Sequence, residues 1–354
     1  MATDSGAHVE GVDTKSAPRV SMAAIARLAG VSVPTVSKVL NGREGVAPQT
    51  RAHIQEVLDE RQYLRRGSGH KRPTGLIDFV IRDLDANWAM PLVQGAENEA
   101  AKAGVSLVVT STHGRRIGNR HWLQHLASRR TDAVVLTVTE FQEGVAEELT
   151  RLNTPVVLID PLGGTSPSIP AVAATNAQGG VAATEHLLRL GHRRIGIISG
   201  PSKVACSRER MAGYREALGR AGIAPDKRLE HWGDFLVEGG RHAAQSLLAL
   251  PNPPTAIFAC SDQMAAGVYK EALRRGISIP DQLSVVGFDD VMIAQWLQPE
   301  LTTVRQPLED MAREAIRVAL RLVNGLDVPQ PRQRLATRLV VRESTAPPSV
   351  TSLG

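Results

Sequence analysis

Residues 21–42 read SMAAIARLAGVSVPTVSKVLNG, and this stretch predicts two short helices joined by a tight turn. Ser21 is suited to cap the first helix and Ser32 the second, because each hydroxyl can accept a hydrogen bond from a first-turn amide. Gly30 stands where a helix end favours positive φ. Pro34 falls in the first turn of the second helix, where a missing N–H costs nothing. The pattern is typical of a helix-turn-helix DNA reader.

Helical periodicity gives each of these helices one apolar face. In the first helix the spacing groups Ile25, Leu28 and Ala29. At about 100° per residue, the second helix divides into a side that can pack on the first and a side that can enter a major groove. An ordinary helical hairpin is the alternative, and the agreement of turn, caps and faces disfavours it. The packing side comprises Val33, Val36, Val39 and Leu40, and the opposite side comprises Pro34, Ser37, Lys38 and Asn41.

The formal net charge of +5 is concentrated near the N-terminus. Between Arg19 and Gly75, ten Lys or Arg face four Asp or Glu, so this segment carries +6 and the rest of the chain about −1. A basic head on a near-neutral body suits contact with DNA phosphates by the head alone.

The length of 354 residues predicts two or three domains. Pro48 opens a third helix, whose Ile54, Val57 and Leu58 can close a three-helix core. The segment after it is rich in glycine and positive charge, as in a linker. The expected organisation is a disordered tail (1–18), a helix-turn-helix domain (19–64), a basic linker (65–75), a core (76–346) and a tail (347–354).

The fold class from Leu76 onward is α/β, because short apolar runs alternate there with amphipathic helices. Runs of about five to seven residues in this arrangement predict βαβ units and parallel sheets, with enough strands for two sheets. Expected strands are 76–81, 105–110, 133–137, 156–160, 195–200, 256–260 and 283–289, and expected helices are 89–103, 179–190, 208–221, 237–250 and 262–275.

Polar and aromatic residues follow several of these strands, at the edge where open α/β sheets bind ligands. Aromatic residues are only 3% of the chain, yet Trp88, Phe235 and Trp296 all fall in expected strand-end loops. A ring can cover the C–H face of a pyranose while neighbouring carboxylates, amides and guanidinium groups pair with its hydroxyls. We therefore expect a small carbohydrate ligand, although each ring alone could simply fill its loop.

We expect a cytoplasmic protein with no membrane contact, no cofactor and no enzymatic activity. The N-terminus shows no apolar signal segment, and no apolar run approaches about 18 residues. Cys206 and Cys260 make no disulfide framework. No G-x-S-x-G elbow, P-loop or G-x-G-x-x-G motif points to catalysis. His121 and His125 have i, i+4 spacing without an apparent third ligand, so no metal site is expected.

The chain resembles the lactose-repressor (LacI/GalR) family of bacterial transcriptional regulators from about Val20 to Ser344. The motifs that carry the resemblance are IARLAGVSVPTVSKVLNG, LLRLGHRRIGIISGP, RMAGYREAL, SVVGFDD, PELTTVRQP and RLVVRES. It implies a dimer with a DNA-binding head, a hinge and a core of two periplasmic-binding-protein-like subdomains, with the effector in the cleft between them. The N-subdomain would be 76–175 and 307–335, and the C-subdomain 176–306 and 336–346.

The resemblance also implies which residues contact DNA. Val33 and Pro34 match the two main specificity positions, and Lys38 matches a basic groove-facing position. Since Val33 and Pro34 offer no side-chain hydrogen bond, Lys38 and Ser37 are left for polar readout of bases. Backbone-contacting or capping positions are Ser21, Ser32, Thr35 and Asn41.

In the effector cleft, Arg210 of RMAGY matches a contact to ligand hydroxyls, and Asp289 of GFDD matches a ligand-binding carboxylate. Asp290 would point to the opposite face of the strand, which argues against a catalytic acid pair. The expected effector residues are Asn87, Trp88, Asp160, Asn176, Arg210, Phe235, Ser261, Asp262, Asp289, Trp296 and Gln306.

The hinge departs from the family pattern, which has an Ala-Arg-x-x-Leu helix whose leucine kinks the operator. Here the segment reads RRGSGHKR, with no leucine and two glycines that disfavour helix. We expect an extended arm with Arg65 and Arg66 on phosphates or in the minor groove, and a weak central kink.

The expected function is that of a dimeric repressor of carbohydrate-use genes, which binds a palindromic operator with an affinity set by a sugar. Induction and co-repression both stay open. A nucleoside or purine effector is the alternative, and a sugar-binding protein without a DNA role is disfavoured by the basic head. The C-terminal tail carries no leucine heptad, so a dimer is expected rather than a tetramer.

Overall fold

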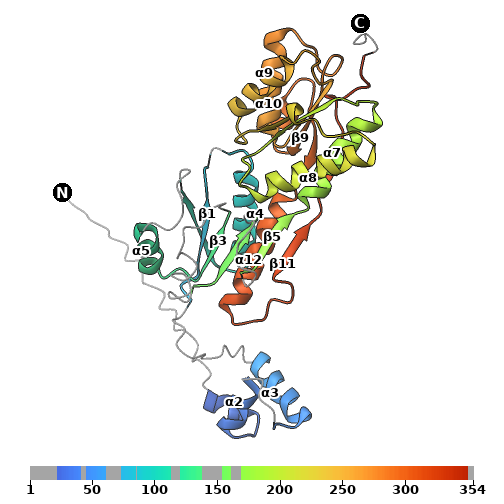
Figure 1. The fold of residues 1–354 in the computed structure, drawn as a ribbon. Helices are drawn as coiled ribbons and strands as arrows, with labels where there is room; N and C mark the ends of the chain where they lie inside the picture. Colours follow the sequence, from blue (N-terminus) through green and yellow to red (C-terminus); the bar gives the residue numbers. More distant parts are fainter. Residues whose placement is uncertain are drawn as a thin grey trace, which may run out of the picture. The chain divides into compact units, whose positions relative to one another are not determined.

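The computed structural model describes residues 22–40, 45–60, 73–84, 86–112, 120–137, 154–160 and 169–349. The chain separates into two compact units, residues 1–72 and 73–354, and each is described by itself (Figure 1). The expected tail over 1–18 and nearly all of the linker lie outside the described residues. Within the described ranges, no helix is both long and apolar enough to cross a membrane.

The first unit contains three helices, α1 (Met22–Leu28), α2 (Val33–Leu40) and α3 (Pro48–Glu60). Gly30 ends α1 with φ of 64°, as its position after the helix predicts. The Ser32 hydroxyl accepts a hydrogen bond from the Thr35 amide at 3.3 Å and so caps α2, which confirms that prediction. The buried core comprises Ile25, Ala26, Ala29, Val36, Val39, Ile54, Val57 and Leu58.

Two side chains expected in this core are exposed instead. Leu28 is 48% exposed, because the face of α1 that packs into the core carries Ile25, Ala26 and Ala29. Val33 is 41% exposed at the start of α2, away from the buried part of that helix. The prediction of their burial is therefore wrong, and the exposure of Val33 is compatible with its other expected role at a DNA groove.

The second unit begins with a six-stranded sheet in which all pairings are parallel (Figure 1). Alternate residues of β1, such as Phe79 and Val80, are buried on opposite faces, against the separate clusters that include Leu92 and Leu126. Helices α4 (Ala89–Lys102) and α12 (Leu308–Val323) supply the first cluster, and α5 (Arg120–Arg129) contributes to the second. The strand order is β11 (Arg332–Leu335), β5 (Ala171–Ala174), β4 (Val156–Ile159), β3 (Ala133–Leu136), β1 (Leu76–Ile81) and β2 (Ser106–Ser111).

A second six-stranded sheet follows, parallel except for the antiparallel pairing of β12 with β10. Helices α7 (Asn176–Arg189) and α8 (Ala205–Arg220) cover one face, and α9 (Val237–Leu248) and α10 (Asp262–Arg275) cover the other (Figure 1). A short 3-10 turn, η1 (Lys227–Leu229), and helix α11 (Ile293–Trp296) complete it. The strand order is β12 (Arg338–Val340), β10 (Thr302–Arg305), β9 (Ser284–Asp289), β8 (Ala256–Ala259), β6 (Ile195–Ser199) and β7 (Glu230–Trp232).

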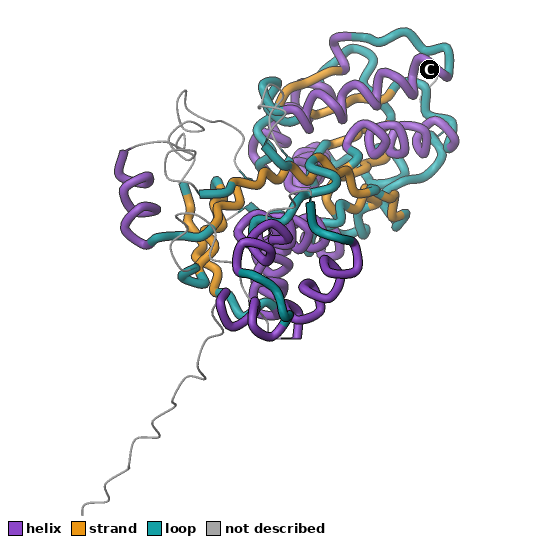
Figure 2. The backbone as a smooth tube through the Cα atoms, turned by 90° about the horizontal axis from the view of Figure 1, so that it is seen from below, coloured by secondary structure: helices purple, strands orange, loops and turns teal. Residues whose placement is uncertain are grey.

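The chain passes between the two sheets after β5, after β10 and after β11. Two of these crossings are tied together, because the Thr337 amide donates to the Thr175 hydroxyl at 2.9 Å. Figure 2 shows the strands of this unit gathered in two groups with helices alongside each. The α/β class, the helix-turn-helix unit and the two parallel-dominated sheets are confirmed. We refer to the parts built on the first and second sheets as the N- and C-subdomains.

Candidate functional site

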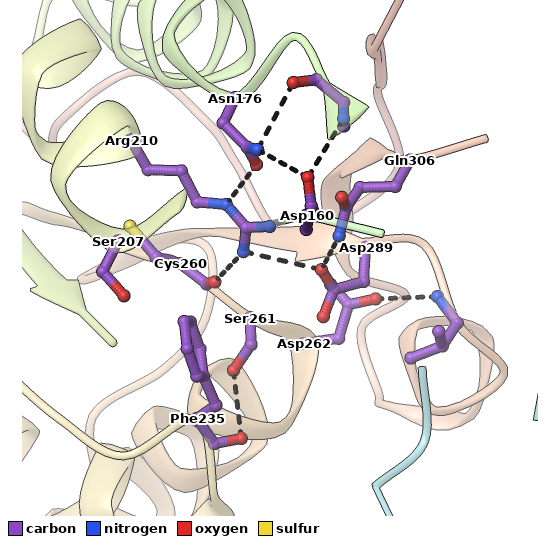
Figure 3. Close-up of polar contacts among 12 residues, drawn as sticks. Asp160, Asn176, Ser207, Arg210, Phe235, Cys260, Ser261, Asp262, Asp289 and Gln306 are labelled. Atoms are coloured by element: carbon purple, nitrogen blue, oxygen red, sulfur yellow. Dashed lines mark hydrogen bonds and ion pairs between the residues drawn. The ribbon is translucent and has the colours of Figure 1, made fainter. Parts of the chain in front are cut away.

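Arg210 lies at the centre of a buried polar group at the carboxyl ends of β8 and β9 (Figure 3). Its side chain is 3% exposed. Nε donates to Asn176 Oδ1 at 2.9 Å, and Nη1 donates to the Cys260 carbonyl oxygen at 2.6 Å. The Phe288 ring centroid lies 3.7 Å from the guanidinium carbon, so the cation stacks on an aromatic face.

Close helix packing sets the position of Arg210. A Cβ at Gly180 of α7 would lie 2.4 Å from the Arg210 carbonyl oxygen, and one at Gly213 of α8 would lie 2.1 Å from the Ala177 carbonyl oxygen. Only glycine permits this approach of α7 and α8. The two helices therefore hold Arg210 and Asn176 side by side.

Acidic and amide side chains complete the group. Asp289 Oδ1 lies 3.6 Å from Arg210 Nη1 and accepts a hydrogen bond from Gln306 Nε2 at 2.6 Å. Asp160, which follows β4 of the N-subdomain, accepts from Asn176 Nδ2 at 3.4 Å and from the Ala174 amide at 3.1 Å. We call Asp160, Asn176, Arg210, Asp289 and Gln306 the polar cluster, and it draws residues from both subdomains.

The ionisation of these acids is perturbed by burial. Burial raises the pKa of Asp289 to about 6, although Arg210 and the hydrogen bond from Gln306 act to lower it. Burial likewise raises the pKa of Asp160, against the opposing effect of Arg210. Burial and the nearby Asp289 raise the pKa of Asp262 well above its ordinary value. The site thus holds three carboxyl groups beside one guanidinium, and burial favours the protonated, uncharged form of each carboxyl group.

Backbone strain also concentrates here. Asp160, Phe235, Asp289 and Asp290 have φ of 44°, 70°, 116° and 59°, in the region that ordinarily favours glycine. Each conformation costs on the order of 1–3 kcal/mol and is retained where surrounding structure enforces it. Asp289 faces the polar cluster, whereas Asp290 pairs with Arg342 at 2.6 Å and with Arg305. The expectation that these two acids point apart is confirmed.

Ser261 and Asp262 serve local structure. The Ser261 hydroxyl accepts from the Met264 amide at 3.1 Å and caps α10. Asp262 accepts from the Val291 amide at 2.9 Å through one oxygen and from the Thr303 hydroxyl at 2.6 Å through the other. Both carboxylate oxygens of Asp262 are therefore engaged by the protein itself.

The three expected aromatic residues have different surroundings. Phe235 is partly buried, and its ring centroid lies 5.8 Å from the Arg210 guanidinium carbon. Trp88 is partly buried against the core cluster of the N-subdomain, and the neighbouring Asn87 is exposed. Trp296 is 71% exposed on α11. Among the described residues, Phe235 is the only one of these three rings that makes a cation–π contact with the polar cluster.

Two residues at the site have no counterpart in the sequence-based expectations, Phe288 and Ser207. Phe288 reads as an ordinary strand core residue, and only its stacking on Arg210 reveals another role. Ser207 is fully buried in α8, and its hydroxyl has no hydrogen-bond partner among the described residues. A single sequence carries no signal for an unpartnered hydroxyl inside a helix.

The two cysteines are free thiols near Arg210. Burial raises the pKa of each to about 12, so both are protonated at neutral pH and poorly nucleophilic. Among the residues with described side chains, no group of three or more His, Cys, Asp or Glu is placed to hold a metal ion. The side chain of His121 lies outside that set.

In the first unit, α2 buries Val36 and Val39 and presents its other described side chains at an exposed edge. This edge carries a cation, small polar groups and an apolar pair, as a groove-reading helix requires. Its members are Ser32, Val33, Pro34 and Lys38, which are exposed, and Thr35 and Ser37, which are partly buried. The other expected DNA contacts, Ser21, Asn41, Arg65 and Arg66, lie outside the described residues.

Two family models match the chain. "Bacterial regulatory proteins, lacI family" covers residues 21–66, and "Periplasmic binding protein-like domain" covers residues 184–345. The ribose operon repressor of Escherichia coli (strain K12) is 33% identical over 330 residues, which are 92% of this chain and 99% of that protein.

Solved structures agree with these matches. A transcriptional regulator CelR–cellobiose complex superposes with a TM-score of 0.72 and 31% identity, covering 92% of this chain and 99% of that one. The lac repressor dimer bound to operator and the anti-inducer ONPF gives a TM-score of 0.67 and 25% identity, covering 93% and 100%. The chain therefore belongs to the lacI family of bacterial regulatory proteins, and it is a ligand-responsive DNA-binding transcriptional repressor rather than an enzyme.

Proposed function

We propose that this repressor controls carbohydrate-use genes as a homodimer in the cytoplasm, and that a small neutral carbohydrate bound at the polar cluster switches its affinity for a palindromic operator. The buried polar cluster beside the Phe235 ring is the observation that carries the proposal. Two of the matched proteins point the same way, since one is a ribose operon repressor and another was solved with cellobiose.

The hydrogen-bonding capacity of the cluster favours a ligand rich in hydroxyl donors. Gln306 Nε2 is committed to Asp289, which leaves the buried Oε1 as an acceptor without a partner among the described residues. Acceptors on Asp289 and Asp160 are balanced by the single guanidinium of Arg210. A sugar hydroxyl can donate to such acceptors while accepting from Arg210, and the sugar's C–H face can cover Phe235.

Residues on both subdomains would couple the ligand to DNA. Asp160 of the N-subdomain meets Asn176 and, through it, Arg210 of the C-subdomain. Arg334 of β11 forms a bidentate pair with Glu209 of α8, at 2.9 and 3.2 Å, across the same boundary. A ligand that binds one arrangement of the subdomains better than another shifts the population toward it. The exposed edge of α2, with Lys38 on it, is the proposed reading surface for each half-site.

Exposed apolar side chains support the dimer. Met292 and Trp296, one helical turn apart at α11, are 64% and 71% exposed, and Leu273 of α10 is 83% exposed. Large apolar side chains in water favour burial against another protein surface. We propose that Trp296 serves the dimer contact, although its position in the sequence first indicated the effector cleft.

A thermal-shift screen tests the ligand class, because binding to the native state alone raises the melting temperature. The panel contains ribose, glucose, cellobiose, adenosine and guanine. A shift with a carbohydrate, lost in Arg210→Ala, supports the proposal, and that carbohydrate should also change retardation of a promoter fragment. A shift with adenosine or guanine alone refutes the carbohydrate class, and elution as a monomer at micromolar concentration refutes the dimer.

A further inference from the structure

Three buried side-chain oxygens have no hydrogen-bond partner among the described residues, namely Thr131 Oγ1, Ser207 Oγ and Gln306 Oε1. An unpaired buried polar atom destabilises the folded state, so such atoms are rare in folded proteins. Gln306 belongs to the polar cluster, and Ser207 lies beside Arg210 (Figure 3). Two of the three unpaired oxygens are thus at one site, which points to a ligand that provides their hydrogen-bond partners.

Ser207 lies on α8 where the face that carries Arg210 borders the face that carries the core residue Met211. It precedes Arg210 by three residues, so the two side chains share one face of the helix. The Ser207 carbonyl oxygen accepts from the Ser199 hydroxyl at 2.9 Å, which ties this turn of α8 to the carboxyl end of β6. The Phe235 ring packs on Gly200, the residue after β6, where a Cβ would lie 2.0 Å from it.

The free hydroxyl of Ser207 is unusual for its place in a helix. A helical Ser or Thr ordinarily donates to the carbonyl four residues earlier. Thr184 in α7 does this, since its hydroxyl donates to the Gly180 carbonyl oxygen at 2.9 Å. For Ser207 that carbonyl belongs to Lys203, and Arg208 Nη1 already donates to it at 2.6 Å. Unlike the Thr184 hydroxyl, the Ser207 hydroxyl has no partner among the described residues.

We propose that Ser207 is a specificity-determining residue whose hydroxyl exchanges a hydrogen bond with one hydroxyl of the effector. The inference rests on the proposed function, because it takes the effector to be a polyhydroxylated molecule held by Arg210 and Asp289. Ser207 and the Gln306 carbonyl oxygen add two neutral hydrogen-bonding groups to the charged pair. Neutral groups discriminate between sugars that differ in a single hydroxyl, since an analogue lacking it leaves the protein group unpaired.

Ser207→Ala provides the test, with Thr131→Val as the matched control. Both variants remove a buried unpaired hydroxyl, but Thr131 lies between α5 and β3 of the N-subdomain, away from the polar cluster. In the ligand-free protein we expect neither variant to melt lower than the wild type, and a rise of about 1–3 °C would reflect the lost desolvation penalty. This melting comparison checks that Ser207→Ala folds.

Calorimetric titration with the panel carbohydrate that gives the largest thermal shift then measures affinity. We expect Ser207→Ala to weaken binding roughly tenfold and Thr131→Val to leave it unchanged. Among deoxy analogues of that carbohydrate, one should bind wild type and Ser207→Ala equally, and this identifies the hydroxyl that Ser207 contacts. Unchanged affinity in Ser207→Ala, with binding still abolished by Arg210→Ala, overturns the role of Ser207 and leaves the proposed function standing. No binding of any carbohydrate by the wild type overturns both.

Discussion

The ionisation of Asp289 makes the stability of the ligand-free protein depend on pH in a direction opposite to that of ordinary acidic residues. Burial raises the pKa of Asp289 from 3.8 to about 6. The folded state therefore binds this proton more tightly than the unfolded state does. The contribution of protonated Asp289 to the free energy of unfolding is complete below pH 4 and is lost as the pH rises through 6.

The size of the effect follows from the displacement of the pKa. At about 1.4 kcal/mol per unit, ionisation of Asp289 costs the folded state on the order of 3 kcal/mol above pH 6. Asp289→Asn removes this ionisation and keeps a side chain of the same shape. We expect the stability of Asp289→Asn relative to the wild type to rise by a few kcal/mol between pH 4 and pH 7.

Chemical denaturation of both proteins at half-unit pH steps gives the comparison, and the difference between them cancels the titration of unrelated groups. Asp289→Glu serves as a control that keeps the ionisable group. A stability difference between wild type and Asp289→Asn that stays constant from pH 4 to 7 would falsify the claim that burial raises the pKa of Asp289.

Three other perturbations test other parts of the account. Lys38→Ala should cost about 1–3 kcal/mol of operator affinity and relax base preference, so equal losses on operator and random DNA in an anisotropy titration would exclude Lys38 as a reader. Gly213→Val should lower the melting temperature by several degrees, because its Cβ would lie 2.1 Å from the Ala177 carbonyl oxygen. An unchanged melting temperature would show that α7 and α8 can move apart with little loss of stability. Asp132 accepts hydrogen bonds from the backbone amides of residues 74–76, where the chain enters the core. Asp132→Ala should therefore reduce the change in DNA affinity that the ligand causes, while the affinity for the ligand stays the same. An unreduced change would show that Asp132 does not couple ligand binding to DNA binding.

The sequence predicts several elements with a strong apolar pattern, but the expected helices and strands omit α12 and β5, which also bury apolar residues. β1 begins and ends where its apolar run does, and α10 follows its Ser261 cap. β11 reads RQRL and lies at a sheet edge with alternate residues exposed, so no apolar run marks it. β7 and β12 are three-residue edge strands, and the β10 run contains two buried threonines. Short strands with neither an apolar run nor a regular alternation of polarity cannot be told from loops in a single sequence.

The candidate site shows the same division. Strand-end positions and the family resemblance both direct attention to Arg210, Asp289, Gln306 and Phe235, and the structure brings these residues together. Exposure is a property of tertiary packing, so the sequence could not show that Trp296 projects into solvent. For the same reason, it could not show that both oxygens of Asp262 are already engaged.

A third limit concerns unpaired groups. Whether a hydroxyl is satisfied depends on every neighbour in space, and Ser207 reads like any serine in a helix. Its unpaired state emerges only when the surrounding donors and acceptors are placed.

The most direct test of the central claim is a fluorescence anisotropy titration of the purified repressor on a fragment selected from genomic DNA, with and without the stabilising carbohydrate. The account predicts tight binding by wild type and Arg210→Ala, and a ligand-dependent change of tenfold or more in affinity, on the order of 1.4 kcal/mol, in wild type alone. Identical wild-type affinities with and without a carbohydrate that demonstrably binds would contradict it.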